Sequence, residues 1–211
     1  MAHKGIHSRG YLPHRDFKDS VQGITFRLKD SVPADVVAEW REELQLQLNR
    51  QDPEASKNAN IILHRKIAKY EDAGYGTCLL ADSEYAGIVQ DALIAGHEVA
   101  YKLIEWCIMP NHVHVLIRLM GASAMGDIVK RWKAGSAIQI NRLLERNGSI
   151  WMRDYYDRFI RDDNHFHDAR VYIRNNPVKA GLCLKPEEWR FSSAGASWDA
   201  EISGENSKLA K

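Results

Sequence analysis

The stretch Met109-Pro-Asn-His-Val-His-Val-Leu-Ile117 decides how this chain is interpreted. A Pro-Asn turn followed by an apolar run is typical of a strand entering a sheet. Side chains alternate between the two faces of a strand, so His112 and His114 share one face, about 7 Å apart. The other face is apolar and carries Val113, Val115 and Ile117. Two imidazoles so placed can bind a divalent cation, although histidines on strands also serve as ordinary hydrogen-bonding residues.

The pattern on either side of this stretch predicts an antiparallel hairpin made of strands 101–108 and 112–119. A further strand is expected at 21–28, and extended segments at 75–80 and 150–161. Helical periodicity and capping residues predict helices at 31–49, 58–72, 82–97, 124–146 and 165–176. Pro177 is expected to end the last helix, because proline disfavours the helical conformation of the residue before it. Few strands separated by helices predict an α+β fold, namely a ferredoxin-like antiparallel sheet with helices packed mainly on one face.

Composition divides the chain into three parts. Residues 1–20 are polar and basic and are interpreted as an N-terminal arm. Residues 21–194 form the expected single domain, which fits the chain length of 211 residues. Residues 195–211 are interpreted as a flexible tail.

Composition also limits the class of protein. The chain is 45% hydrophobic and 27% charged, and no run of eighteen apolar residues exists, so no membrane span is expected. The N-terminus lacks the apolar core of a signal peptide, and three widely spaced cysteines predict reduced thiols in a cytoplasmic protein. The formal net charge of +1 argues mildly against a large nucleic-acid footprint.

Basic residues nevertheless gather locally, and several alternate with aromatic ones around residues 151–161. Such interleaving suits a single-stranded or structured nucleic acid, with rings for stacking and cations for phosphates. The alternative is a solvated helix face together with a few core aromatics. The candidate DNA contacts are Arg153, Arg158, Arg161, Lys130 and Lys133, and in the N-terminal arm Arg9 and Arg15.

The predicted helix that begins at residue 165 carries a tyrosine next to an apolar stripe. The stripe consists of Phe166, Ala169 and Ile173. Tyr172 and Asn176 are four residues apart and lie together on an adjoining face. The Asn176 side-chain oxygen could coordinate a hard cation, which would complete a site begun by the two histidines. The alternative is a packed tyrosine whose hydroxyl lies at the surface.

The order and spacing of several motifs resemble the REP-associated tyrosine transposases, which are relatives of the small insertion-sequence transposases in the HUH single-strand nuclease superfamily. The resemblance covers most of the chain, from about residue 10 to residue 198. The matching segments are 9–14 (RGYLPH), 25–28 (TFRL), 106–115 (WCIMPNHVHV), 150–161 (IWMRDYYDRFIR) and 172–182 (YIRNNPVKAGL).

The resemblance implies roles for particular residues. His112 and His114 would hold a divalent metal, Mg²⁺ or Mn²⁺, and Tyr172 would be the nucleophile. Asn176 has the position of the third ligand, although it lies beside a proline. Tyr155 and Tyr156 are the rival tyrosines, but neither precedes an Asn-Pro motif.

The reaction implied by the resemblance is transesterification of single-stranded DNA near hairpin or palindromic elements, through a 5′-phosphotyrosine intermediate. The implied partner is single-stranded or hairpin DNA, a monomer is favoured over a dimer, and the implied location is cytoplasmic and associated with the nucleoid. Two alternatives stay open at this point. One is a metal-dependent hydrolase with a structural tyrosine, and the other is a catalytically idle protein that binds hairpin DNA.

Overall fold

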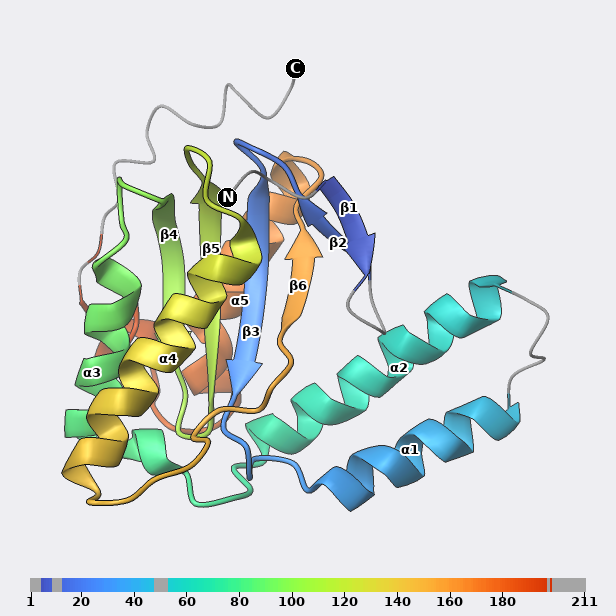
Figure 1. The fold of residues 1–211 in the computed structure, drawn as a ribbon, viewed down its shortest axis with the longest axis horizontal. Helices are drawn as coiled ribbons and strands as arrows, with labels where there is room; N and C mark the ends of the chain where they lie inside the picture. Colours follow the sequence, from blue (N-terminus) through green and yellow to red (C-terminus); the bar gives the residue numbers. More distant parts are fainter. Residues whose placement is uncertain (1–4, 9–12, 48–52, 197, 199–211) are drawn as a thin grey trace.

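The architecture was taken from a computed structural model of the chain, which describes residues 5–8, 13–47, 53–196 and 198. Its centre is a four-stranded antiparallel sheet with the strand order β4-β5-β3-β6 (Figure 1). The strands are β3 (Val21–Arg27), β4 (Tyr101–Ile108), β5 (His112–Leu119) and β6 (Tyr156–Phe159). The predicted hairpin of β4 and β5 and the predicted α+β fold class are thus confirmed.

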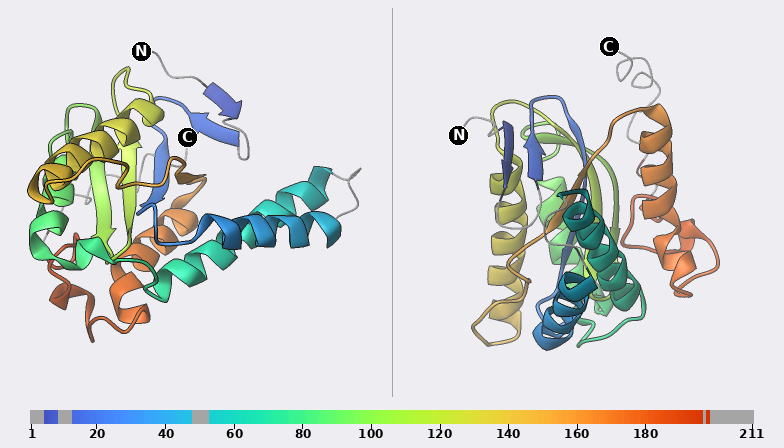
Figure 2. Two further views of the ribbon diagram at one scale, coloured as in Figure 1. Left: turned by 60° about the horizontal axis from the view of Figure 1, so that its bottom comes forward. Right: turned by 90° about the vertical axis from the view of Figure 1, so that its right-hand side faces the viewer.

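Helices cover both faces of this sheet (Figure 2). Helices α3 (Ser83–Ile94) and α4 (Met125–Leu143) lie on one face, and α5 (Asp163–Lys179) lies on the other. The larger core lies beneath α3 and α4, where Phe26 contacts both Trp132 and Trp151. More of the described helices thus lie on one face, as predicted, and α5, which covers the second face, carries Tyr172.

Strand β5 has the alternation that the sequence predicts. Val113, Val115 and Ile117 belong to the core beneath α3 and α4. Leu116, from the opposite set, packs with Phe166 and Ile173 of α5 in a second core. Because side chains alternate along a strand, His112 and His114 lie on the face that α5 covers.

Helices α1 (Ala34–Gln47) and α2 (Pro53–Asp72) form a hairpin that projects away from the sheet (Figure 1). A small apolar cluster that includes Leu44 and Leu63 holds the two helices together. The C-terminal end of α2 returns to the sheet, where the buried Glu71 pairs with the buried Arg27 of β3 at 3.4 Å. Burial raises the pKa of Glu71 to about 8, although the Arg27 guanidinium opposes the rise. This contact fixes where the neighbouring Asp72 lies.

Several predicted boundaries were wrong. Helix α2 begins at Pro53 rather than at 58, since proline is well tolerated in the first turn of a helix. Residues 75–80 do not form an extended segment, because the chain turns there into a short 3₁₀ helix, Leu79–Ala81.

Helix α5 does not end before Pro177 but continues to Lys179. A proline this close to the C-terminus removes only one backbone hydrogen bond, and Pro177 is buried, which offsets the loss. The helix is instead terminated by Gly181 in the left-handed conformation (φ 73°), as is common at helix C-termini.

The two ends of the chain are more structured than the sequence indicates. The predicted arm contains a separate two-stranded hairpin, β1 (Gly5–Ser8) and β2 (Pro13–Asp16). In the predicted tail, Trp198 packs edge-on against Trp106 at 5.0 Å between ring centroids. The remaining tail residues, 197 and 199–211, lie outside the described part of the chain, so the predicted domain limits stay predictions.

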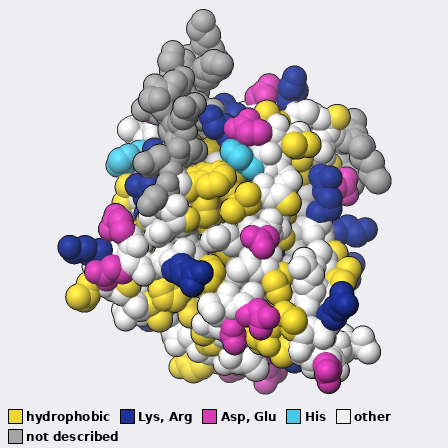
Figure 3. Space-filling model, turned by 90° about the vertical axis from the view of Figure 1, so that its left-hand side faces the viewer, with side chains coloured by type: hydrophobic (Ala, Val, Ile, Leu, Met, Phe, Trp, Pro, Cys, Tyr) yellow, Lys and Arg dark blue, Asp and Glu magenta, His cyan; other side chains and the backbone are white. Residues whose placement is uncertain are grey.

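The outer surface agrees with the small net charge. On the face seen from the α3 side, acidic and basic side chains are interspersed around a group of hydrophobic ones (Figure 3). Among the described residues, no helix combines the length and the apolar character needed to cross a membrane.

Candidate functional site

The two histidines of β5 meet on the face that α5 covers. Their side chains are buried, and their Nε2 atoms lie 3.0 Å apart. The rings are nearly perpendicular, at 85° with centroids 4.7 Å apart. The two histidines predicted to share a face therefore converge through their Nε2 atoms.

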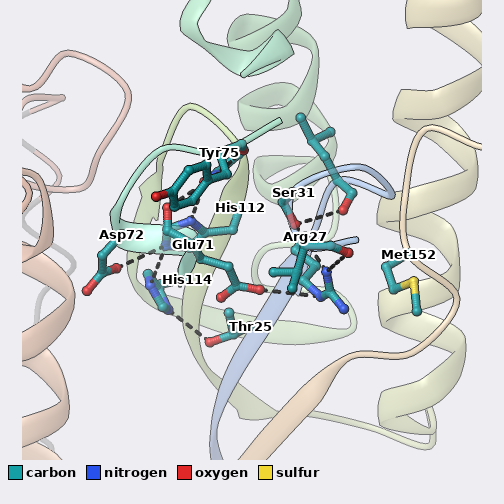
Figure 4. A network of polar contacts seen from close by, with 12 residues as sticks. Thr25, Arg27, Ser31, Glu71, Asp72, Tyr75, His112, His114 and Met152 are labelled. Atoms are coloured by element: carbon teal, nitrogen blue, oxygen red, sulfur yellow. Dashed lines mark hydrogen bonds and ion pairs between the residues drawn. The ribbon is translucent and has the colours of Figure 1, made fainter. Parts of the chain in front are cut away.

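The second nitrogen of each ring, Nδ1, contacts a different neighbour (Figure 4). The amide nitrogen of Asn111 donates to the carbonyls of Glu71 and Tyr75, so its oxygen is left to accept from His112 Nδ1 at 2.7 Å. The neutral His112 ring then has its lone pair on Nε2. His114 Nδ1 lies 2.9 Å from the hydroxyl of Thr25, which can either donate or accept.

Both imidazoles are neutral at physiological pH. Burial lowers the pKa of His112 well below its usual range, and the neighbouring His114 adds to this effect. Burial lowers the pKa of His114 to about 3, with a smaller contribution from the positive charge of Lys179. Neutral imidazole is the form that binds metal ions.

Helix α5 brings Tyr172 to this pair. Its ring lies edge-on to His114, with the centroids 5.4 Å apart and the planes at 79°. The side chain is 41% exposed, so a substrate can reach it. Burial of part of the ring and the negative charge of Asp72 raise the pKa of Tyr172, while Lys179 and the Asn176 amide oppose the rise. The hydroxyl is thus protonated at neutral pH.

Asn176 lies one helical turn after Tyr172 and is fully buried. Its amide lies close enough to Tyr172 to affect the phenol, but neither its oxygen nor its nitrogen makes a hydrogen bond of normal geometry. Buried amides are almost always hydrogen-bonded, so this one is available for a ligand.

The sequence did not predict that a third element, the end of α2, also contributes to the site. Asp72 Oδ1 lies 3.9 Å from His112 Nε2 and is buried without a hydrogen-bond partner. Asp72 Oδ2 accepts from Lys179 at 3.1 Å, and the Lys179 ammonium lies 5.6 Å from the centre of the Tyr172 ring. Lys179 lies within the 172–182 motif. No sequence signal links Asp72, forty residues upstream, to the histidines.

The donor set fits a divalent cation. Two neutral imidazole nitrogens converge, and Asp72 Oδ1, which lies 3.9 Å from one of them, is buried without a hydrogen-bond partner. The Asn176 amide, one helical turn after Tyr172, is also unsatisfied. Within the described residues, no three His, Cys, Asp or Glu side chains already surround a common point. A site built here therefore needs an amide ligand or a rotated carboxylate in addition to the two histidines.

The structure separates Tyr172 from the two rival tyrosines. Tyr155 packs against the core beneath α3 and α4, on the face opposite the histidines. Tyr156 pairs with Thr25, which in turn pairs with His114, so its side chain points to the histidine face. Its ring, however, packs on His64 of α2 at 4.4 Å.

The candidate DNA contacts are dispersed. Arg158 is exposed on the edge strand β6, and its register opposite Gly23 and Leu116 places it on the histidine face. Arg153 and Arg161 are also exposed. Arg9 and the side chain of Arg15 lie outside the described part of the structure.

The two candidate lysines lie on α4, which covers the opposite face of the sheet. Lys130 is exposed. Lys133 donates to the carbonyls of Met152 and Arg153 at 2.5 and 2.7 Å, and burial lowers its pKa to about 8. Lys133 would have to leave both carbonyls before it could contact DNA.

A buried carboxylate fixes α5 against the sheet. Glu105 of β4 is 1% exposed and accepts from Arg170 Nε at 2.9 Å and from Arg174 Nε at 3.2 Å. The hydroxyl of Ser193 also donates to it. Because Arg170 and Arg174 flank Tyr172 on α5, this cluster sets the position of the tyrosine relative to the histidines.

Comparison with known proteins shows similarity to transposases over part of the chain. A family model described as IS200-like transposase matches residues 90–176, which include His112, His114, Tyr172 and Asn176 but not Asp72. Over this segment the chain is similar to the IS200-like transposases.

The individual relatives are more specific. The chain is 30% identical to a putative REP-associated tyrosine transposase of Haemophilus influenzae, over 112 residues that cover 48% of this chain and 64% of the relative. It is also 30% identical to an uncharacterised protein of the same organism over 102 residues, covering 36% and 54%. The chain thus spans less than two thirds of both relatives.

The fold has a counterpart among solved structures. A REP-associated tyrosine transposase bound to a REP hairpin superposes with a TM-score of 0.54 at 15% identity, covering 90% of this chain and 82% of that one. The resemblance predicted from the sequence is confirmed.

Replacing Glu105 by glutamine should destabilise the protein by about 3 kcal/mol, because two guanidinium groups lose their buried counter-charge. Urea unfolding measures the difference. Asp168→Asn, which changes an exposed carboxylate on the same helix, is the control and should shift stability by less than about 0.5 kcal/mol. If the two variants unfold alike, the cluster does not anchor α5.

Proposed function

We propose that this chain is a transposase-type transesterase, which cleaves and rejoins single-stranded DNA next to hairpin elements. Tyr172 is the nucleophile, and His112, His114 and Asn176 hold a divalent cation, Mg²⁺ or Mn²⁺. The observation that carries this proposal is the contact between the exposed Tyr172 ring and the ring of His114. The Nε2 atom of His114 in turn lies 3.0 Å from Nε2 of His112.

In the proposed reaction, the Tyr172 oxygen attacks a phosphodiester phosphorus. A bond forms between the tyrosine oxygen and phosphorus, and the bond from phosphorus to the 3′ oxygen breaks. The products are a 5′-phosphotyrosine and a free 3′-hydroxyl. A second 3′-hydroxyl then reverses the attack and rejoins the strands, so no external energy source is needed.

The surroundings of Tyr172 define what activation it needs. Its pKa is raised, so the phenol must lose its proton to water or a base as the attack proceeds. Lys179 opposes the raised pKa and lies close enough to stabilise a developing phenolate or a phosphate oxygen.

A bound Mg²⁺ or Mn²⁺ would polarise the phosphate oxygens and stabilise the leaving 3′ oxygen. His112 and His114 are suited to hold it because both rings are neutral and both are oriented by neighbours. Asn176 is suited because its buried amide makes no hydrogen bond of normal geometry.

The proposed substrate is hairpin DNA with a single-stranded flank, as the solved structural counterpart is bound to a REP hairpin. Arg158 on the histidine face, with Arg153 and Arg161, is the best-placed candidate for backbone contacts. We propose that the protein acts as a monomer, because Tyr172 reaches the histidines of its own chain. A location at the nucleoid follows from the substrate.

Replacing Tyr172 by phenylalanine should abolish cleavage of a labelled hairpin oligonucleotide in Mn²⁺, a loss of at least about a thousandfold, because the attacking oxygen is gone. A denaturing gel reports both the cleaved strand and the covalent protein–DNA adduct. The matched control is Tyr156→Phe, which keeps the ring that packs on His64. It should cleave normally.

The same gel separates the alternatives. Cleavage by Tyr172→Phe at the wild-type rate would identify a hydrolase with a structural tyrosine. Binding of the hairpin by the wild-type protein without metal dependence, cleavage or adduct would identify an idle DNA-binding protein.

Replacing Thr25 by valine should weaken Mn²⁺ binding about 10- to 100-fold. To bind a metal through Nε2, His114 must carry its proton on Nδ1, and the Thr25 hydroxyl lies 2.9 Å from that nitrogen and can accept the proton. Mn²⁺ titration followed by electron paramagnetic resonance measures the affinity. Thr25→Ser keeps the hydroxyl and should bind as the wild type does, whereas equal binding by Thr25→Val would contradict this role.

A further inference from the structure

The end of α2 adds a carboxylate to the histidine pair, from outside the segment that the transposase family model matches. Asp72 is directed at the two imidazoles (Figure 4). The distance of 3.9 Å from its Oδ1 to His112 Nε2 is too long for a hydrogen bond but short enough for two ligands of one cation after a small side-chain rotation.

The two oxygens of Asp72 have different surroundings. Oδ2 is held by Lys179, while Oδ1 is buried and has no hydrogen-bond partner. An unsatisfied carboxylate oxygen is costly to bury, and it faces nitrogens that lack a charge of their own. A bound cation would satisfy Asp72 Oδ1, which has no other partner.

The charge balance of the site points the same way. Imidazole binds a metal ion in its neutral form, so the two histidines and the Asn176 amide contribute no negative charge to a dication. Mg²⁺ and Mn²⁺ favour carboxylate oxygen, and affinity rises with the number of charged ligands. In the absence of a DNA phosphate, Asp72, which faces the histidines, can supply this negative charge.

We propose that Asp72 is a further ligand of the divalent cation, and this inference rests on the proposed metal-dependent function. The Asp72 carboxylate rotates from Lys179 towards the space between the two Nε2 atoms. Lys179, whose side chain is 62% exposed, is then released beside Tyr172, where it can meet a substrate phosphate. The salt bridge between Asp72 and Lys179 thus describes the metal-free site.

The buried Arg27–Glu71 pair fixes this geometry. It anchors the last turn of α2 to β3, and β3 pairs directly with the strand that carries the histidines. The carboxylate of Asp72 therefore has a rigid base, although it comes from a helical hairpin that otherwise projects away from the sheet.

The test is Mn²⁺ binding to the full chain without DNA, measured by electron paramagnetic resonance. Asp72→Asn should bind Mn²⁺ at least about tenfold more weakly than the wild type, because the one anionic ligand is lost. Lys179→Met, which removes the competing cation, should bind at least as tightly as the wild type. Asp91→Asn, which changes an exposed carboxylate on α3, should leave binding unchanged.

The outcomes distinguish the inference from the function on which it rests. Equal affinity of Asp72→Asn and the wild type would overturn Asp72 as a ligand while leaving the histidine site intact. Lys179→Met could also weaken Mn²⁺ binding as severely as Asp72→Asn does. That result would overturn Asp72 as a ligand, because Asp72 would then act only by holding Lys179. Absence of Mn²⁺ binding by the wild type would overturn the metal-dependent function itself.

Discussion

The close approach of two neutral imidazole nitrogens is the constraint on which the site depends. His112 and His114 present Nε2 atoms 3.0 Å apart, and Asn111 and Thr25 fix the outer side of each ring. In two rings with lone pairs on both Nε2 atoms, those lone pairs would repel each other. One ring must therefore carry its proton between them, or a cation must take the proton's place. The surrounding fold orients the two rings so that either a proton or a cation can lie between their Nε2 atoms.

Three separate parts of the fold meet at that point. Strand β5 supplies the histidines, α5 supplies Tyr172 and Asn176, and the end of α2 supplies Asp72. Two of these parts, α5 and the end of α2, are each held to the sheet by a buried charged side chain. Glu105 binds two arginines of α5, and Arg27 binds Glu71 at the end of α2. Leaving a buried charge without its partner is costly, so these contacts fix positions well. Figure 4 shows how the α2 end closes one side of the site.

Local patterns predicted the parts of the structure that local physics decides. The alternation along β5 placed both histidines on one face, and the helical spacing placed Tyr172 and Asn176 together. The predicted end of α5 was wrong, because the burial of Pro177 outweighs the tendency of proline to end a helix. Asp72 could not be predicted, since only the packing of a projecting helical hairpin brings it to the histidines. The contacts of Lys133 could not be predicted for the same reason, because the carbonyls that it binds lie 19 and 20 residues further along the chain, before β6.

Diffraction from a crystal soaked in Mn²⁺, recorded with anomalous scattering, tests the central claim most directly. The account predicts a single strong anomalous peak within bonding distance of Nε2 of both His112 and His114, next to the Tyr172 ring. A crystal that takes up Mn²⁺ elsewhere, or not at all, while the two imidazoles stay hydrogen-bonded to each other would contradict it.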